Sequence, residues 1–377
     1  MLTVIRLLPV LDYGGVETCT VAQSQLMKRE GLELRICTFW KEGDAAEKIR
    51  DAGVAVDCLG VDPAIRNPRA TVALYRYLRQ QSPDILHASI TEANLHGVMA
   101  GKMAQVPCII TEEVGEPRQR SWKAHGMVGA TMHLADHCIG VSKPVAQYLT
   151  GRLHLPEHKV THLDNGVTAW DVPSEATGRS ARRDFGIPEG APVIGSVGRL
   201  DDEIKRFSDL IDAVAELEYM EQPPWLVIAG DGPDREALEA AARRAELGER
   251  VVFTGFQSDI RRIYAMMDIF ALLSQHEAFG LVVVEAMFSE LPVVVTDTGG
   301  MSGIVVDGMT GFKIPRFSPV KAARKLRTLV ESPETRGRFG RAGRTRGIEY
   351  YSSERYSREL CDLYFDLGAT FCQRSRK

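Results

Sequence analysis

Residues 276–287 read His-Glu-Ala-Phe-Gly-Leu-Val-Val-Val-Glu-Ala-Met, and the rest of the chain is interpreted around them. Glu277 falls in a predicted loop, and Glu285, eight positions later, falls inside the helix predicted to follow. Gly280 has no Cβ, so the backbone can approach a ligand there. The amides at a helix start favour an anion such as phosphate. Because carboxylates accept hydrogen bonds from hydroxyls, the segment suits a phosphate joined to polyhydroxyl groups, as in a nucleotide-sugar.

The flanking residues place this segment in a βαβ unit. Residues 267–274 and 291–296 are predicted to be buried strands before and after the helix, and the second leads into Thr298-Gly299-Gly300. Ligands gather at the carboxyl ends of parallel strands, where Glu277 is expected. Two glutamates at this spacing are otherwise usually a solvated helix surface, so the interpretation depends on the neighbouring residues.

This segment resembles the E-x7-E signature of the retaining glycosyltransferases of the GT-B fold, family 4. The likeness includes Ala-Phe-Gly-Leu at residues 278–281, the Glu-Ala-Met that begins at Glu285, and the Gly-Gly of residues 299–300. Further family motifs recur in order along almost the whole chain. The resemblance implies two Rossmann-like, doubly wound α/β domains that face each other across a cleft, with the nucleotide-sugar bound in the second.

Length and patterning agree with two domains. A chain of 377 residues is long enough for two domains of ordinary size. Strand and helix patterns alternate along both halves, which predicts parallel, doubly wound sheets. Residues 168–178 are largely polar, and we place the interdomain linker there. The expected domains are residues 1–168 and 169–352, and the resemblance adds that a C-terminal helix, about residues 353–377, packs back on the first.

Composition narrows the class of partner. The net charge of −4 gives no general attraction to nucleic acid. The seven cysteines show no CxxC spacing, which fits buried free thiols in a reducing cytoplasm. We expect a cytoplasmic protein that at most touches a membrane surface, since no apolar run approaches the ~20 residues needed to cross one. Arg118, Arg120 and Lys123, beside apolar residues 127–132, fit contact with anionic lipid or a solvated helix face.

Cations are expected near the donor phosphates, because a leaving diphosphate gains negative charge. Gly198-Arg199-Leu200 ends a predicted buried strand, and Lys205 follows in a predicted loop before a helix expected to start near Ser208. We find no DxD motif or His/Asp cluster with ligand spacing, so no metal or other cofactor is expected. The resemblance assigns Arg199 and Lys205 to the diphosphate, and two solvated surface cations are the alternative.

The donor site follows from the resemblance. Glu277 is expected to hold the donor sugar and Glu285 the ribose, while the base docks mostly against main chain at Gly255 and Phe256. Glu277, Arg199 and Lys205 are the predicted catalytic residues. The predicted donor-binding residues are Gly14, Gly15, Gly198, Arg199, Lys205, Gly255, Phe256, Glu277, Ala278, Phe279, Gly280, Leu281 and Glu285.

The first half of the chain holds two of the donor-binding candidates and all of the acceptor-side candidates, which are Tyr13, His87 and Glu113. Gly14-Gly15, after the predicted strand of residues 3–8, matches the family's Gly-Gly-x-Glu motif, although a tight turn is the alternative. Tyr13 shares that loop, and His87 ends another predicted strand, where a structural histidine is equally in keeping. Glu113 stands where the family commonly has a histidine, so we expect an acceptor or sugar contact or a solvated acid. Gly303 replaces a glutamate of the family pattern.

The predicted reaction is transfer of a sugar from a nucleotide-diphosphate sugar, with a UDP-sugar preferred, and with retention of configuration. The expected acceptor is a saccharide, a lipid-linked molecule or a small molecule, in bacterial glycan or glycoconjugate biosynthesis. Three alternatives stay open: a catalytically degenerate nucleotide-sugar-binding subunit, a phosphorylase or hydrolase on the same fold, and a two-lobed solute-binding protein.

Overall fold

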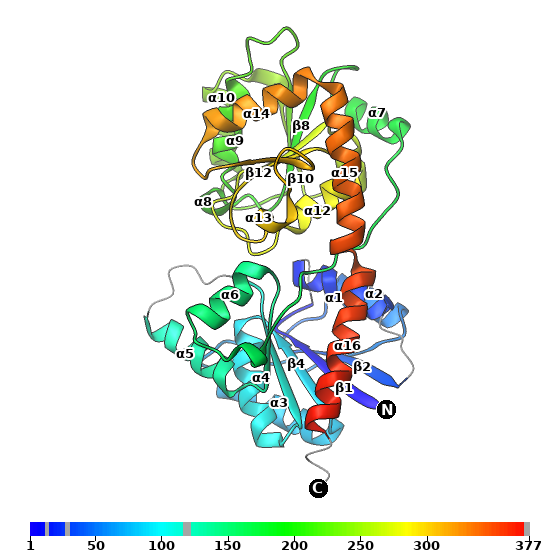
Figure 1. Cartoon of the computed structure of the whole chain (residues 1–377), viewed down its shortest axis with the longest axis vertical. Coiled ribbons are helices and arrows are strands. Elements are labelled where there is room, and N and C mark those ends of the chain that lie inside the picture. Colours follow the sequence, from blue (N-terminus) through cyan, green and yellow to red (C-terminus); the bar gives the residue numbers. More distant parts are fainter. Residues whose placement is uncertain (12–14, 27–30, 116–121, 373–377) are drawn as a thin grey trace. The chain divides into compact units, whose positions relative to one another are not determined.

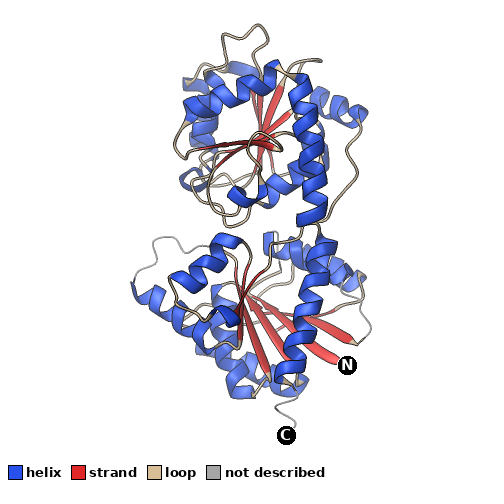
Figure 2. Cartoon of the chain, viewed as in Figure 1, coloured by secondary structure: helices blue, strands red, loops and turns tan. Residues whose placement is uncertain are grey.

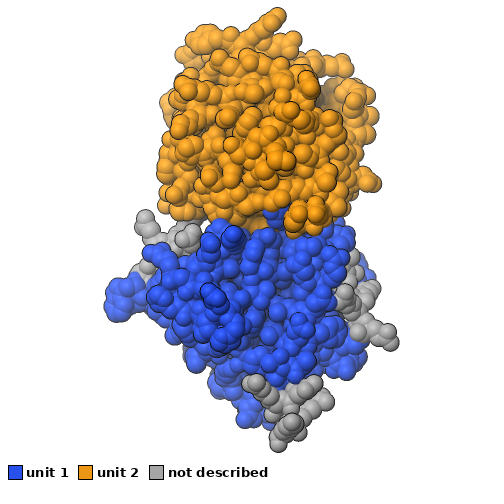
Figure 3. Space-filling model, in the orientation of Figure 1, with its two compact units in different colours: residues 1–168, 351–377 blue, residues 169–350 orange. Residues whose placement is uncertain are grey.

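The computed structural model describes residues 1–11, 15–26, 31–115 and 122–372. The chain divides into two compact units, which we call unit 1 (residues 1–168 and 351–377) and unit 2 (residues 169–350) (Figure 3). Each unit contains a parallel β-sheet with helices on both of its faces (Figure 2). The predicted α/β class, with a doubly wound sheet in each half, is therefore confirmed.

The sheet of unit 1 has seven strands in the order β3-β2-β1-β4-β5-β6-β7. Figure 1 shows β1 between β4 and β2. These strands are β1 (Leu2–Leu8), β2 (Leu32–Thr38), β3 (Ala55–Cys58), β4 (Ile85–Ser89), β5 (Cys108–Glu113), β6 (His137–Gly140) and β7 (Val160–His162). The helices of this unit are α1 (Gly15–Leu26), α2 (Asp44–Asp51), α3 (Pro68–Gln81), α4 (Thr91–Ala104), α5 (Trp122–Leu134), α6 (Lys143–Gly151) and α16 (Ser353–Phe371).

Successive side chains of β1 point to opposite faces of the sheet, and both faces are buried. Ile5 and Leu7 enter the core that α3, α4, α5 and α6 cover. Val4 enters the core that α16 covers. Arg6 points to the same face as Val4, so a charged residue is buried beneath the last helix.

A cluster of charged and polar groups fills this position in place of apolar side chains. Arg6 Nη2 lies 2.9 Å from Glu112 Oε2, and the two side chains are 2% and 1% exposed. Helix α16 supplies two further partners. Tyr356 donates its hydroxyl to Glu112 Oε1 at 3.1 Å. The Tyr364 hydroxyl lies 2.6 Å from His87 Nδ1. The α16 helix is thus bound to the sheet by polar contacts as well as by its apolar face.

The two chain segments at the boundary of unit 1 are hydrogen-bonded to each other. Val167 donates its amide to Tyr351 O at 2.9 Å, and Ser353 donates to Val167 O at 2.9 Å. Gly166 makes this approach possible, because a Cβ added there would lie 2.5 Å from Tyr356 Cβ. The chain therefore leaves unit 1 and returns to it through one paired connection.

The sheet of unit 2 has six strands in the order β10-β9-β8-β11-β12-β13. These strands are β8 (Val193–Val197), β9 (Trp225–Ala229), β10 (Val251–Gly255), β11 (Ile269–Leu272), β12 (Val293–Thr296) and β13 (Gly311–Ile314). The helices of this unit are α7 (Glu175–Asp184), α8 (Asp202–Lys205), α9 (Phe207–Ala215), α10 (Arg235–Arg244), α11 (Ile260–Ala265), α12 (Leu281–Phe288), α13 (Met301–Ile304), α14 (Pro319–Glu331) and α15 (Pro333–Tyr351).

The predicted linker, residues 168–178, is too long. Trp170 is already bound to unit 2, since its Nε1 donates to Ser289 Oγ at 3.1 Å and its carbonyl accepts from Arg344 Nη1 at 2.9 Å. Helix α7 then begins at Glu175, with the hydroxyl of Ser174 accepting from Thr177 N at 3.2 Å. The polar composition that predicts a loop belongs here to a capped helix whose outer face is exposed.

We expect Arg6→Met to lower the free energy of unfolding by roughly 3–5 kcal/mol, because Glu112 would stay buried without its cation. Urea unfolding followed by circular dichroism measures this loss. Arg35→Met is the matched control: the Arg35–Asp57 pair, at 3.0 Å, joins side chains that are 30% and 37% exposed. Its loss should cost less than about 1 kcal/mol. Equal losses in the two variants would contradict the structural role of the buried pair.

Candidate active site

Strand order reverses between β8 and β11, which are neighbours in the unit 2 sheet. Loops that leave two such strands turn to opposite faces of the sheet and open a crevice at its carboxyl edge. Arg199 lies in the loop after β8, and Glu277 lies in the loop after β11. The topology thus brings the two predicted catalytic loops to one switch point.

Lys205 and Glu277 form an ion pair at this switch point. Their Nζ and Oε2 atoms are 2.5 Å apart, and the side chains are 19% and 16% exposed. Lys205 ends the one-turn helix α8, whereas the sequence had predicted a loop. The amide of Gln275 donates to Ile204 O at 2.8 Å, which ties α8 to the loop after β11. This main-chain bond brings the cation to the carboxylate.

Arg199 is exposed, and its side chain has no hydrogen bond or ion pair with any other described residue. Its loop is nevertheless fixed, because Gly198 donates its amide to Ala229 O at 3.0 Å. Gly230, with a φ of 127°, allows the loops to touch, since a Cβ there would lie 1.9 Å from Gly198 O. Arg199 is therefore a cation on a fixed loop, available to an anion.

The helix after Glu277 begins with open amides. Gly280 is the N-cap of α12 and has a φ of 109°, a conformation that favours glycine. The amides of Gly280 and Leu281 donate no hydrogen bond to another described residue. The predicted residues Ala278 and Phe279 lie between Glu277 and this cap. Unpaired amides and the helix dipole together make the start of α12 an anion-binding position.

Gly299 and Gly300 hold the Glu277 loop in place by close backbone contact. Gly300 donates its amide to Glu277 O at 3.1 Å. Gly299 has a φ of 52°, and a Cβ added there would lie 1.7 Å from the same carbonyl oxygen. A Cβ on Gly300 would lie 2.5 Å from Phe279 Cα. The Gly-Gly pair is thus required by space, because no larger residue fits against this loop.

Glu285 lies within α12 and is half-buried. Its Oε2 accepts the hydroxyl of Tyr264 at 2.7 Å. Burial raises the pKa of Glu285, and the Tyr264 hydrogen bond opposes that rise. Glu277 and Glu285 therefore have different partners, a lysine for the first and a tyrosine for the second.

The predicted base-docking residues lie at the end of β10. Gly255 has a φ of 70°, and its carbonyl accepts the amide of Gly230 at 2.9 Å. Phe256 follows it and is 60% exposed. A large exposed aromatic ring beside a fixed main chain is compatible with stacking against a base, and that role stays a prediction.

Several predicted residues of unit 1 fall outside the described part of the chain. These are Tyr13, Gly14, Arg118 and Arg120. Gly15 is described as the first residue of α1. The role of Gly14 and Gly15 at the donor phosphates therefore stays a prediction.

The structure corrects the predicted substrate contact of His87. The sequence left open a contact with substrate, but the side chain is fully buried beneath α16 and bonded to Tyr364. Burial and the Arg6 cation lower the pKa of His87 to about 3, so the imidazole is neutral. The histidine belongs to the buried cluster of unit 1 and is closed to a substrate.

Glu113, the other acceptor-side candidate, ends β5 and is only 3% exposed, so it is not a solvated acid. One carboxylate oxygen accepts the amide of Gly115 at 3.4 Å. The side chain borders a cavity of about 10 Å³ between α4 and α5, a volume that holds about one water molecule. Contact with an acceptor stays a prediction for this residue.

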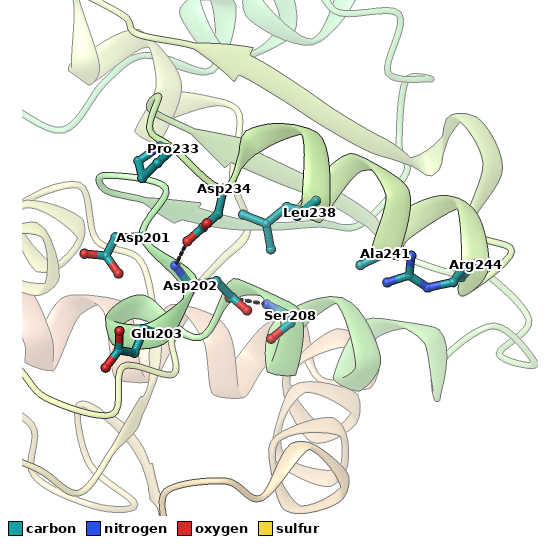
Figure 4. Close-up of a pocket in the computed structure, with 10 residues that line it drawn as sticks. Asp201, Asp202, Glu203, Ser208, Pro233, Asp234, Leu238, Ala241 and Arg244 are labelled. Atoms are coloured by element: carbon teal, nitrogen blue, oxygen red, sulfur yellow. Dashed lines mark hydrogen bonds between the residues drawn. The ribbon is translucent and has the colours of Figure 1, made fainter.

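A larger hollow of about 590 Å³ lies beside α8 and α10 (Figure 4). Asp202 donates its amide to Asp234 and accepts the amide of Ser208 through its own carboxylate. The residues that line the hollow are Asp201, Asp202, Glu203, Ser208, Pro233, Asp234, Ala237, Leu238, Ala241 and Arg244. Four carboxylates against one arginine would repel a diphosphate, and no predicted donor residue lines the hollow. It is therefore distinct from the candidate site.

Among the described residues, no group of three or more His, Cys, Asp or Glu side chains is placed to hold a metal ion. Arg199, Lys205 and Glu277 are charged residues at the switch point. The arrangement offers two cations, a carboxylate and open helix amides within one loop region of unit 2. Such a set can bind an anion that carries hydroxyl groups.

The amino-acid sequence matches two protein-family models and resembles several known proteins. The model for glycosyl transferases group 1 matches residues 179–346, and the model for Glycosyltransferase Family 4 matches residues 13–169. A GDP-mannose-dependent alpha-mannosyltransferase of Mycobacterium tuberculosis is 30% identical over 325 residues, which cover 81% of each chain. The chain belongs to glycosyltransferase family 4. An Alpha-D-kanosaminyltransferase of Streptomyces kanamyceticus is 28% identical to this glycosyltransferase over 270 residues, 71% of this chain and 68% of the relative.

Solved structures share the fold of this glycosyltransferase. HepE from Anabaena, in complex with UDP, matches with a TM-score of 0.82 and 20% identity, over 97% of this chain and all 100% of that chain. The same protein in complex with UDP-glucose matches with a TM-score of 0.84 and 18% identity, over 97% and 100% of the two chains. The fold is therefore GT-B, as the resemblance implied.

Sequence reasoning missed two features of the candidate site. Helix α8 has four residues, too few to show a helical period. Tyr264 precedes the predicted strand of residues 267–274, and nothing in its spacing from Glu285 marks the two as partners. An aromatic residue with a hydroxyl in a fully buried run was the available signal, because a buried tyrosine hydroxyl usually has a partner.

We expect Gly299→Ala to destabilise unit 2 by roughly 1–3 kcal/mol, because the new Cβ would strike Glu277 O and the backbone would sit at an unfavourable φ. Thermal unfolding followed by circular dichroism measures the loss. Gly303→Ala is the matched control, since a Cβ at that helical position meets no atom within 4 Å. That variant should stay within about 0.5 kcal/mol of the parent protein. A Gly299→Ala protein as stable as the control would show that the loop contact is dispensable.

Proposed function

We propose that this glycosyltransferase transfers a sugar from a nucleotide-diphosphate sugar, with UDP as its nucleotide, and retains the anomeric configuration without a metal ion. The acceptor is a saccharide, a lipid-linked molecule or a small molecule of bacterial glycan or glycoconjugate biosynthesis. The ion pair of Lys205 and Glu277, beside the open start of α12, carries the proposal. It joins in one place a cation for phosphate and a carboxylate for sugar hydroxyls.

The diphosphate is the leaving group in this proposal. When its bond to the anomeric carbon breaks, negative charge builds on the phosphate oxygens. Arg199, the ammonium of Lys205 and the amides at the start of α12 counter that charge, and fixed groups of this kind lower the barrier because they need no reorganisation. Donor binding draws Lys205 toward the phosphates, which frees Glu277 for the sugar hydroxyls.

Retention is proposed to follow a front-face route. The acceptor hydroxyl attacks the anomeric carbon on the face that the diphosphate leaves, and a phosphate oxygen takes the proton of that hydroxyl. No covalent nucleophile is assigned. The separate bonds of Glu277 to Lys205 and of Glu285 to Tyr264 support this choice, because a retaining glycosidase uses two carboxylates that flank one bond.

The choice of UDP rests on the solved structures of HepE, which hold UDP and UDP-glucose. The mannosyltransferase relative is named for GDP-mannose, so GDP is the competing nucleotide. Gly255 and Phe256 are the residues proposed to receive the base. Because the site there is mostly main chain, its side chains favour neither base strongly.

We expect Glu277→Gln to keep UDP binding within about threefold of the parent protein but to reduce sugar transfer by about 100-fold or more, because only the carboxylate is lost. Calorimetry with UDP and release of UDP from a panel of sugar donors measure the two effects. The assays contain EDTA, in which activity should persist.

Glu203→Gln is the matched control, since it removes an exposed acid of α8 that lies outside the site. It should change neither quantity. Unchanged transfer by Glu277→Gln would remove Glu277 from the site. Turnover that needs no acceptor would favour a hydrolase. Transfer of the sugar to or from free phosphate would favour a phosphorylase. Nucleotide binding without any turnover would favour a degenerate subunit.

We also propose a peripheral contact between unit 1 and an anionic membrane, which suits a lipid-linked acceptor. Among the described residues no helix is long and apolar enough to cross a bilayer. Helices α4 and α5, however, expose large apolar side chains: Trp122 (80%), Leu134 (60%), Met103 (55%) and Met99 (49%). Lys123 lies over the Trp122 ring at 5.5 Å. Apolar side chains with adjacent lysine suit the lipid headgroup region.

We expect the protein to sediment with phosphatidylglycerol vesicles at low salt, and Trp122→Ser to weaken that binding about tenfold, since a buried indole contributes on the order of 1–3 kcal/mol. Trp40→Ser is the control, because Trp40 is 45% exposed on a different part of unit 1. Equal binding by all three proteins, or none by the parent, would refute the contact.

A further inference from the structure

The support of Glu285 is built from residues that have no part in the proposed chemistry. Tyr264 is fully buried in α11, and its hydroxyl lies 2.7 Å from Glu285 Oε2 and 3.2 Å from Val282 O. A hydroxyl has one proton, so it donates to the nearer and charged acceptor. Among the residues that the structure describes, Tyr264 is the one hydrogen-bond donor to this carboxylate. The second carboxylate oxygen, Oε1, is left for a ligand.

The Tyr264 ring cannot change direction freely. It packs against Trp170, with ring centroids 6.0 Å apart, and against Phe270, at 5.9 Å. Trp170 is itself fixed, since its Nε1 donates to Ser289 Oγ, and that hydroxyl donates to Glu285 O at 3.2 Å. Trp170 therefore supports both the tyrosine that binds the carboxylate and the turn of α12 that carries it.

We propose that Tyr264, supported by Trp170, is a positioning residue that aims the Glu285 carboxylate at the ribose hydroxyls and so determines preference for a ribonucleotide over its 2′-deoxy form. This inference rests on the proposed function, in which Glu285 receives the ribose. A carboxylate with one oxygen fixed presents the other in a single direction. That direction distinguishes a sugar with neighbouring hydroxyls from one that lacks a hydroxyl.

The same contact affects the charge of Glu285. Burial raises the pKa of Glu285 and the Tyr264 bond lowers it, so loss of the hydroxyl raises the pKa further. Burial and Glu285 also raise the pKa of Tyr264 well above its usual range, which keeps its proton available for donation. The elements α13, β11 and β12, which pack on α12, carry no titratable side chain. Arg344 approaches from α15 and binds the carbonyls of Phe288 and Trp170.

We expect the parent protein to bind UDP about tenfold more tightly than 2′-deoxy-UDP, as one charged hydrogen bond allows. Tyr264→Phe keeps the ring but should reduce this preference to less than about threefold. In that variant, UDP affinity should also begin to fall at a higher pH on acidification, because Glu285 takes up its proton earlier. Calorimetry at a series of pH values measures both effects, with GDP and 2′-deoxy-GDP run in parallel.

Tyr77→Phe is the matched control, because it removes a tyrosine–carboxylate bond of 2.6 Å, to Asp57, in the other unit. It should leave the ribose preference and the pH profile unchanged. Glu285→Gln should lose the preference and the acid dependence together. Should Tyr264→Phe fail to fold, Trp170→Phe replaces it, and an unchanged preference in that variant overturns the inference.

The outcomes separate the two levels of the proposal. A parent protein that binds neither UDP nor GDP overturns the proposed function and the inference with it. A parent protein that binds a nucleotide but ignores the 2′-hydroxyl removes Glu285 from the ribose and overturns the inference alone. Tyr264→Phe with the full preference and an unshifted pH profile also overturns it, while the transferase assignment stands.

Discussion

The candidate site depends on one close contact between two stretches of main chain. The Gly-Gly pair after β12 lies against the loop after β11, and Gly300 donates to the carbonyl of Glu277. Nothing larger than glycine fits there, so the loop has one course. In that loop the Glu277 side chain pairs with Lys205, and the amides of Gly280 and Leu281 at the start of α12 stay open. The positions of the charged residues thus depend on two glycines, Gly299 and Gly300, which have no side chains of their own.

The fold was largely predictable because its signals are local. Helix α14 spans Pro319–Glu331, and both its apolar spacing and the proline at its start lie within the segment itself. The meeting of Lys205 with Glu277 was predictable only through the resemblance. In the structure it depends on the bond from Gln275 in the loop after β11 to Ile204 in α8, and no spacing along the chain encodes that bond.

Single residues with two plausible roles were the hardest to predict. His87 ends a strand at the carboxyl edge of its sheet, where a histidine can face either a ligand or a covering helix. His87 faces the covering helix because α16, which lies far along the chain, places Tyr364 against it. Arg6 offered a better signal: a charge inside an apolar strand needs a buried partner, and Glu112 supplies it.

The return of α16 to unit 1 has a consequence for the order of events during synthesis. Residues 169–350 are contiguous along the chain and form one compact unit, so all of unit 2 is synthesised before α16 of unit 1. Synthesis of unit 1 begins first but is completed last, because the buried pair of Arg6 and Glu112 lacks its Tyr356 partner until residue 356 has left the ribosome. While unit 2 is being translated, one face of the unit 1 sheet would therefore stay uncovered by α16. Exposed apolar surface of this kind is what chaperones bind.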